Sequence, residues 1–225
     1  MTEAPAVKRL ALWGGAALAA ACTVEVQRTV FGTGEEVEEP RAVESFASVV
    51  VSDDLHARVV SGVERPLVVV RGYENLLGMV RTEVRADRLV IEVAEGFDLD
   101  PVPQVLIHAP ELRSIAYRGS GKAEVEGLAG EHVELALEGS GSLRAQGEVT
   151  VLRLHTVGSG DVDLLELTAC EADVDATGSG VVCVRVAESL DLHQIGSVEV
   201  SVAGGGTIER RSLGCGSVRR VPAQE

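Results

Sequence analysis

The stretch Glu138–Val182, EGSGSLRAQGEVTVLRLHTVGSGDVDLLELTACEADVDATGSGVV, contains the tripeptide Gly-Ser-Gly three times and decides the fold class. A fourth copy begins at Gly119, and the same phase continues, at a slightly shorter interval, through Gly196 and Gly214. A self-similar period of about 20 residues is typical of a solenoid, in which each repeat forms one rung.

Apolar and polar residues alternate on both sides of each tripeptide. Leu135 and Leu137 precede the copy at Gly139, for example, and Leu143 and Ala145 follow it. This alternation predicts two short strands per repeat, each with one buried face. A phosphate-binding loop would require a helix after the glycines, and a flexible linker would not alternate. We therefore predict that the glycines form one corner of every coil, where they supply a positive φ or allow close backbone approach. These corner glycines are Gly119, Gly121, Gly139, Gly141, Gly158, Gly160, Gly178, Gly180, Gly196 and Gly214.

Stacking of the rungs, about 4.8 Å apart, places equivalent residues in columns. One predicted column is Ser114, Glu134, Arg153, Asp173, Asp191 and Glu209, and a second is Glu124, Arg144, Asp163, Cys183, Ser201 and Arg219. Each column has an arginine between two acids. We expect these residues to form exposed ion pairs that fix the register of neighbouring rungs more than they stabilise the fold. Asp173 and Asp191 are adjacent like charges, which a bound cation or a shift of register would relieve.

The segment from Met1 to Cys22 has the features of an export signal. Lys8 and Arg9 precede an uncharged run, Leu10–Ala21, that is too short to cross about 30 Å of hydrocarbon as a helix. Small residues then lead into Cys22, which resembles the lipobox of bacterial lipoproteins. We expect lipid attachment at Cys22 and anchoring to a bacterial envelope, with inner or outer membrane undecided. The alternative is an ordinary secretory signal, with Cys22 incidental.

Composition narrows the class of partner. The net charge of −15 argues against nucleic acid or an anionic membrane surface as a partner, because both require clustered Lys and Arg.

The cysteines form no evident framework. With Cys22 lipidated, Cys170, Cys183 and Cys215 remain, an odd number without metal-knuckle spacing. We interpret them as structural, although two of them could pair. No cofactor is predicted, and the oligomeric state stays open.

The remaining chain divides by composition. Residues 23–42, including GTGEEVEEPR, are predicted to be an acidic solvated spacer. Residues 43–110 carry strand runs such as PLVVVRG and RLVIEV, and GYENLLGMVRTEV is the one place where a short helical turn is expected. Residues 111–221 hold the repeats, and 222–225 form a tail. The four arginines of ERRSLGCGSVRR are expected to protect the open C-terminal end by their charge.

From Phe31 to Val221 the chain resembles the GIN domain, assigned as the head of auto-transporter adhesins on bacterial surfaces. The resemblance lies in the order of VFGTGEEVEEPRAVESFASVVVS, HARVVSG, LVVVRGYENLL, TEVRADRLVIEV and VLIHAPELRSIAYRGSG before the repeats. It departs at Ser197-Val198 and at Gly214-Cys215-Gly216. The resemblance implies an all-β, right-handed parallel β-helix-like solenoid with about 18–20 residues per rung. It brings no catalytic residues.

Two features invite interpretation as metal sites. His155, Asp175 and His193 lie three places before their corner glycines on consecutive rungs, and imidazole and carboxylate are ordinary zinc ligands. The alternative is a surface ladder in which Asp175 pairs with a protonated histidine. The segment Asp161–Asp175 is rich in acids but lacks the spacing of known calcium loops, so a solvated acidic face is the other interpretation.

The sequence thus predicts an exported, lipid-anchored, non-enzymatic solenoid that binds an envelope protein or a glycan, or acts as a scaffold. One alternative is an enzyme on polysaccharide, which would require a groove with converging arginines and acids. Another is a purely structural stalk with no selective ligand.

Overall fold

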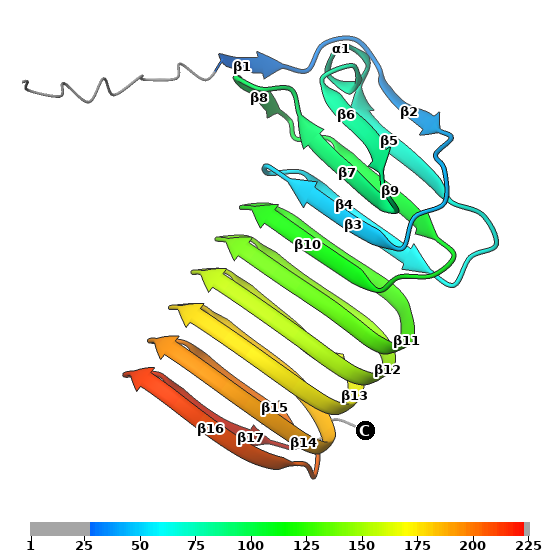
Figure 1. Cartoon of the computed structure of the whole chain (residues 1–225). Helices are drawn as coiled ribbons and strands as arrows, with labels where there is room; N and C mark the ends of the chain where they lie inside the picture. Colours follow the sequence, from blue (N-terminus) through cyan, green and yellow to red (C-terminus); the bar gives the residue numbers. More distant parts are fainter. Residues whose placement is uncertain (1–27, 223–225) are drawn as a thin grey trace, which may run out of the picture.

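The Gly-Ser-Gly region forms a parallel β-solenoid of about five turns, which confirms the predicted fold class (Figure 1). The computed structural model describes residues 28–222, so the signal segment, Cys22 and most of the tail lie outside the described residues. Successive corner glycines pair in register, from Gly119 with Gly139 through to Gly196 with Gly214. The interval between corner glycines in the sequence is therefore the length of one rung.

Each rung is one long bent strand rather than the predicted two short ones. Register shifts mark the bend, as between Val125 and Leu128, and Gly147 has a φ of +142° at this second corner. The N-terminal half of each long strand lies in one face of the solenoid, and the C-terminal half lies in the opposite face. The long strands are β11 (Lys122–Gly139), β12 (Ser142–Gly158), β13 (Asp161–Gly178) and β14 (Val181–Gly196).

Shorter strands extend both faces. The first face consists of β6 (Val80–Arg85), β7 (Arg88–Val93), β3 (Ser48–Ser52), β10 (Ser114–Gly119), the C-terminal halves of β11–β14, and β16 (Thr207–Gly214). The second face consists of β2 (Glu36–Arg41), β5 (Leu67–Tyr73), β9 (Gln104–Ala109), β4 (His56–Ser61), the N-terminal halves of β11–β14, β15 (Glu199–Ala203) and β17 (Ser217–Val221). A separate pair, β1 (Arg28–Phe31) and β8 (Phe97–Asp100), lies at the N-terminal end.

The core between the two faces is built from columns of aliphatic side chains. Leu135, Leu154, Val174 and Leu192 occupy consecutive rungs in register, and each is at most 2% exposed. Burial of such a side chain contributes roughly 1.5–3 kcal/mol. Because each rung buries its apolar face only against its neighbours, the stack is stable as a whole and not rung by rung.

The corner requires glycine for both of the reasons considered from the sequence. Gly139 has a φ of +123°, and a Cβ atom on it would lie 2.5 Å from the carbonyl oxygen of Gly119 on the next rung. A Cβ on Gly141 would lie 2.7 Å from the Gly121 oxygen. The serines between the glycines are exposed, and Ser159 Oγ lies 3.1 Å from Ser179 Oγ. The tripeptide is a stacked backbone corner.

The spacer prediction requires a correction for residues 28–41. β1 pairs with β8, and β2 pairs antiparallel with β5, so these residues belong to the folded sheets. Arg41 donates to the carbonyl oxygens of Val80 and Leu77, at 2.5 and 2.8 Å, and to Thr82 Oγ1 at 2.9 Å. The acidic composition of β2 led to the wrong prediction because its glutamate side chains point to solvent, while Val37 packs against the core.

The helical turn is found where the sequence placed it. α1 (Glu74–Leu77) buries Leu76 and Leu77 over the N-terminal end of the core. Asn75 ties it to the preceding chain, because its Oδ1 accepts the N–H of Thr33 and its Nδ2 donates to the oxygen of Phe31. Within residues 28–222, no helix is long and apolar enough to cross a membrane.

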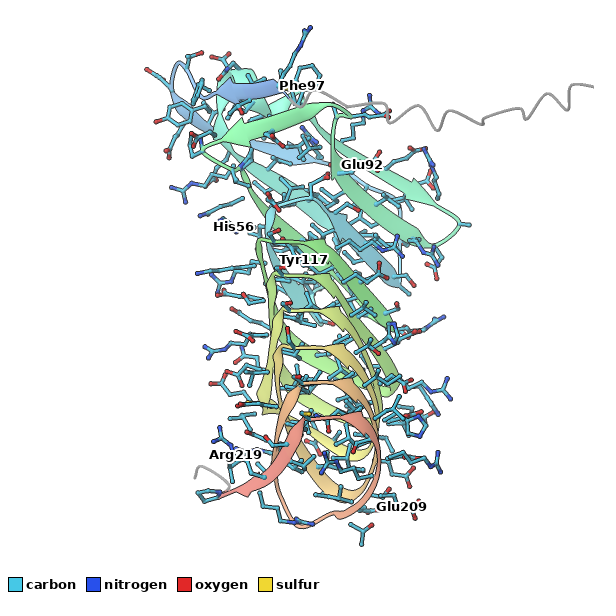
Figure 2. The ribbon with its side chains drawn as sticks, turned by 90° about the vertical axis from the view of Figure 1, so that its left-hand side faces the viewer. His56, Glu92, Phe97, Tyr117, Glu209 and Arg219 are labelled. Carbon is cyan, nitrogen blue, oxygen red and sulfur yellow. The ribbon has the colours of Figure 1, made fainter. Side chains whose placement is uncertain are left out.

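Two arginines lie over the open C-terminal end. Arg210 pairs in register with the buried Leu192, and Arg220 with the buried Val202, so both occupy core-facing positions of the last rung. Their chain neighbours Glu209 and Arg219 are labelled at this end of the solenoid in Figure 2. Arg210 donates to Gln194 Oε1 and to the Gly216 oxygen, at 3.1 and 2.8 Å. Arg220 donates to the oxygens of Gly204 and Gly206. Charge at core positions disfavours continuation of the solenoid by another chain.

Candidate functional site

The predicted histidine–aspartate column is in register on the first face, with His155 beside Asp175 and Asp175 beside His193. His193 Nδ1 lies 3.2 Å from Asp175 Oδ1, and Arg211 Nη1 lies 2.7 Å from His193 Nε2. With Nδ1–H donated to Asp175, Nε2 accepts from Arg211, so both ring nitrogens have protein partners. In residues 28–222, no group of three or more His, Cys, Asp or Glu side chains is arranged to hold a metal ion.

Two carboxylates of the acidic segment accept hydrogen bonds from neighbouring rungs. Asp161 Oδ1 accepts the N–H of Val181 at 3.0 Å, and Asp163 Oδ2 accepts from Arg144 Nη2 at 2.7 Å. Arg144 and Asp163 are neighbours in the second predicted column, and both predicted columns are found in register. These side chains are exposed, so the ion pair contributes little to stability.

The three cysteines in the described range are free thiols, so no two of them pair. Cys170 and Cys183 are half-buried, and Cys215 is exposed. Burial raises the pKa of the Cys183 thiol above its usual value, which keeps it protonated at neutral pH. The lipid-attachment candidate, Cys22, lies outside the described residues.

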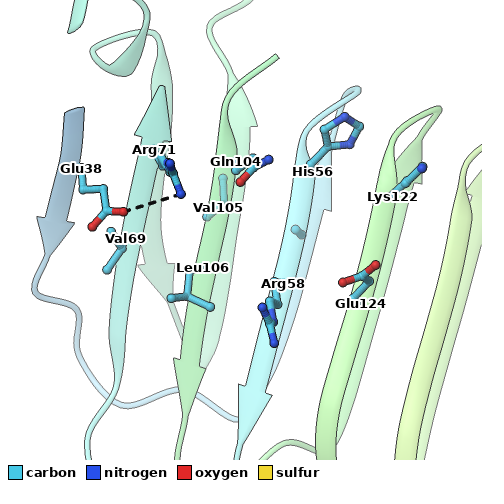
Figure 3. A pocket seen from close by; sticks show the side chains of 11 residues that line it. Glu38, His56, Arg58, Val69, Arg71, Gln104, Val105, Leu106, Lys122 and Glu124 are labelled. Carbon is cyan, nitrogen blue, oxygen red and sulfur yellow. Dashed lines mark ion pairs between the residues drawn. The ribbon is translucent and has the colours of Figure 1, made fainter. Parts of the chain in front are cut away.

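A groove of about 520 Å³ lies on the second face, over β2, β5, β9, β4 and β11 (Figure 3). Side chains from these five strands project into it in two parallel rows, because residues two apart on a strand point to the same side of the sheet. We call the rows the polar row and the central row. The polar row is Glu38, Arg71, Gln104, His56 and Lys122, and the central row is Val69, Leu106, Arg58 and Glu124.

The polar row places five different polar groups side by side across five strands. Glu38 pairs in register with Arg71, Arg71 with Gln104, and Gln104 with His56. Lys122 lies beside His56, one residue before the pair formed by Ala123 and Ala57. With neighbouring strands about 4.8 Å apart, the row from Arg71 to Lys122 spans about 14 Å. A ligand lying across the strands meets a carboxylate, a guanidinium, an amide, an imidazole and an ammonium in turn.

Two members of the polar row have hydrogen-bonding capacity that the fold does not use. The ammonium of Lys122 makes no ion pair or side-chain hydrogen bond within the described part of the chain. Nδ1 of His56 is buried without a hydrogen-bond partner there. Arg71 makes only a long contact, 3.9 Å, with Glu38, and both side chains are more than half exposed. An unsatisfied buried nitrogen costs about 1–3 kcal/mol, and rotation of the ring toward a ligand in the groove would remove that cost.

The central row is less polar and better paired. Val69 and Leu106 form a small half-buried apolar floor, flanked by Arg58, whose Nη2 lies 2.7 Å from Glu126 Oε1. The groove therefore has an aliphatic floor with a polar wall along one side. This combination fits a ligand that has C–H faces as well as hydrogen-bonding edges.

Reasoning from the sequence missed the groove. The alternation in HARVV and PLVVVRG showed which of their side chains point outward. However, β4 and β5 both pair with β9, which is distant in the sequence, β4 in parallel and β5 antiparallel. The corner glycines repeat, whereas these strands do not, so no period reveals which side chains become neighbours.

Comparisons with known proteins agree with the fold. A structure of a putative adhesin from Bacteroides fragilis has a TM-score of 0.70 at 16% identity, covering 85% of this chain and all of that one. A putative adhesin from Parabacteroides merdae gives a TM-score of 0.55 at 15% identity, covering 86% of this chain and 99% of that one. A putative lipid binding protein from Parabacteroides distasonis gives 0.53 at 20% identity, covering 86% of this chain and all of that one.

Identities this low show a shared fold and no more. No curated protein matches the chain in sequence. The family model described as "Putative auto-transporter adhesin, head GIN domain" matches residues 45–206, well over half of the chain. That match spans most of the N-terminal strands, α1 and the solenoid as far as β15. The chain therefore belongs to the GIN-domain family of putative auto-transporter adhesin heads.

Proposed function

We propose that this protein is an exported, non-enzymatic binding module of the adhesion type, tethered to the bacterial envelope by lipid on Cys22. In this proposal the groove on the second face takes an envelope component, a glycan or a protein. One observation carries the proposal: five strands present a row of polar side chains to solvent, and the fold leaves Lys122 and His56 Nδ1 unused within the described residues. Membership of an adhesin-like family supports a role at the cell surface.

The position of the groove supports an occupant close to the anchoring membrane. β1 begins at Arg28, and the groove lies on the strands of the N-terminal part of the molecule (Figure 1). The short segment between Cys22 and Arg28 reaches at most about 22 Å when fully extended. A lipid on Cys22 would therefore keep the groove near the membrane, among the polymers of the same cell's envelope.

The groove brings arginines and acids together, which is the feature expected of a polysaccharide-acting enzyme. Arg58, however, is engaged by Glu126, and the contact between Arg71 and Glu38 is loose and exposed. Neither pair is held in the desolvated environment that general acid–base catalysis uses to tune its groups. We therefore place binding ahead of turnover, and analysis of the ligand after a binding assay would detect turnover directly.

Anchoring is tested by expressing the full-length chain and its Cys22→Ala variant in a bacterial host. We expect a lipid-modified mass and partition into detergent for the parent chain, and neither for the variant. An unmodified, aqueous parent chain would remove the anchor from the proposal.

Binding is tested with the Cys22→Ala chain, because a lipid on Cys22 would itself insert into membranes. This chain is co-sedimented with purified envelope polysaccharide and, separately, with envelope membranes stripped of polysaccharide. Selective, saturable retention by one fraction is expected, and a Lys122→Gln variant is expected to be retained less. Absence of retention by either fraction would favour the structural stalk.

A further inference from the structure

We propose that the groove is a binding site for a glycan that carries carboxylate groups, such as one that contains uronic or sialic acid. This inference rests on the proposed function above, because it names the ligand of the same site. It is carried by the spacing of the hydrogen-bond donors in the polar row, by the strands beneath the row and by the residue types that line the groove.

The hydrogen-bond donors of the polar row have a spacing suited to a polymer of charged sugars. Arg71 and His56 are two strands apart, about 10 Å, and Lys122 lies one strand further, beyond His56. A hexose in an extended chain has about the length of one strand spacing, so carboxylates on alternate sugars recur at about the spacing of alternate strands. Gln104, between Arg71 and His56, supplies an amide for the intervening sugar.

The unused groups of the row match the chemistry of this ligand. Lys122 is a cation without a partner in the described part of the chain, within a protein of net charge −15. A carboxylate beside it gains a charge-assisted hydrogen bond without breaking an existing one. His56 gains the partner that its Nδ1 lacks through rotation of the ring toward the ligand.

The backbone of the central strands beneath the groove is unavailable, which disfavours an extended peptide as the occupant. β5 lies between β2 and β9, β9 between β5 and β4, and β4 between β9 and β11. Each of these strands therefore has both edges paired, so a peptide cannot bind here by adding a strand. The ligand is recognised through side chains alone.

The residue types of the lining distinguish an acidic glycan from a neutral one. The described lining residues include no Phe, Tyr or Trp, so a sugar ring finds no aromatic face on which to stack. Val69 and Leu106 offer only a small aliphatic floor. Affinity must therefore come from charge and hydrogen bonds. Glu38 and Glu124 lie at the borders of the groove, where carboxylates accept hydroxyl protons of the sugars.

The test is isothermal titration of the purified full-length chain with three oligosaccharides: trigalacturonate, a hyaluronan tetrasaccharide and sialyllactose. Each is compared with its methyl ester, which has the same sugars without the charge. We expect at least one acid to bind, its ester to bind at least about tenfold more weakly, and binding to weaken with added salt. Lys122→Gln and Arg71→Gln are each expected to weaken it about fivefold. Arg153→Gln, which removes an exposed arginine of the first face, should bind like the parent chain.

The outcomes separate the inference from the proposed function. Equal binding of acids and esters, or unchanged binding by both groove variants, overturns the inference that the ligand is a carboxylated glycan. If no acid binds while envelope polysaccharide or stripped membranes still retain the chain, the inference fails and the proposed function stands. If stripped membranes alone retain it, the occupant is a protein. Release of unsaturated uronate during the titration would show that the groove is an active site. Circular dichroism melting of each variant confirms that a loss of binding is not a loss of fold.

Discussion

Substitution of Gly139 by alanine tests the stacked corner directly. The new Cβ would lie 2.5 Å from the carbonyl oxygen of Gly119, and the residue would keep a φ of +123°. A non-glycine residue in such a conformation costs on the order of 1–3 kcal/mol. Relief of the clash by displacement of the rung costs about another 1–3 kcal/mol. We therefore expect a loss of about 4 kcal/mol in the free energy of unfolding, a large part of a typical total of about 5–15 kcal/mol.

The assay is urea denaturation followed by circular dichroism, with Ser140→Ala as the matched control. Ser140 is the exposed neighbour in the same tripeptide, so its replacement is expected to change the free energy of unfolding by no more than about 0.5 kcal/mol. The thermal midpoint of Gly139→Ala should fall by about 8–16 °C. A loss below about 1 kcal/mol would show that the rungs separate easily, and the close approach would then not be the reason for glycine.

Three further outcomes are expected. Burial raises the pKa of Tyr117 to about 12, so the folded state holds that proton more tightly than the unfolded state. The contribution of Tyr117 to stability should therefore be constant below about pH 10 and fall between about pH 10 and 12, by up to about 2.7 kcal/mol. Alkaline urea titrations should show a correspondingly smaller fall for Tyr117→Phe. The double variant Arg210→Leu/Arg220→Leu extends an apolar core to an open edge, so light scattering should show association with rising concentration, while a monomer would contradict the capping role. Arg144→Gln removes an exposed ion pair and should cost no more than about 1 kcal/mol by urea denaturation; a larger loss would mean that the pair fixes the register energetically.

The solenoid was predictable because its contacts repeat. Once Gly119 and Gly139 are recognised as equivalent, the register of every later rung follows, including the neighbours of Arg144 and His193. Parallel stacking converts a sequence interval directly into a column of side chains. What the interval did not reveal was the chain path, in which the two strands of each repeat join into one bent strand.

The N-terminal part shows where sequence reasoning reaches its limit. Alternation placed strands near β5 and β7 and a turn at α1, but it did not assign their partners. The run containing Arg41 was predicted to be a solvated spacer because acids dominate it. Only the tertiary structure reveals that Arg41 reaches three acceptors on α1 and β6.

The sequence by itself determined the class of fold, the rung length, the corner glycines and the charged columns, because each depends on a period that the chain repeats. The tertiary structure alone decided the groove. Its polar row joins side chains from β2, β5, β9, β4 and β11, which lie far apart in the sequence and are brought together by two antiparallel pairings and two parallel ones. Such pairings form by long-range burial of Val and Leu side chains beneath the sheet, so the side chains on the outer surface become neighbours without any local signal.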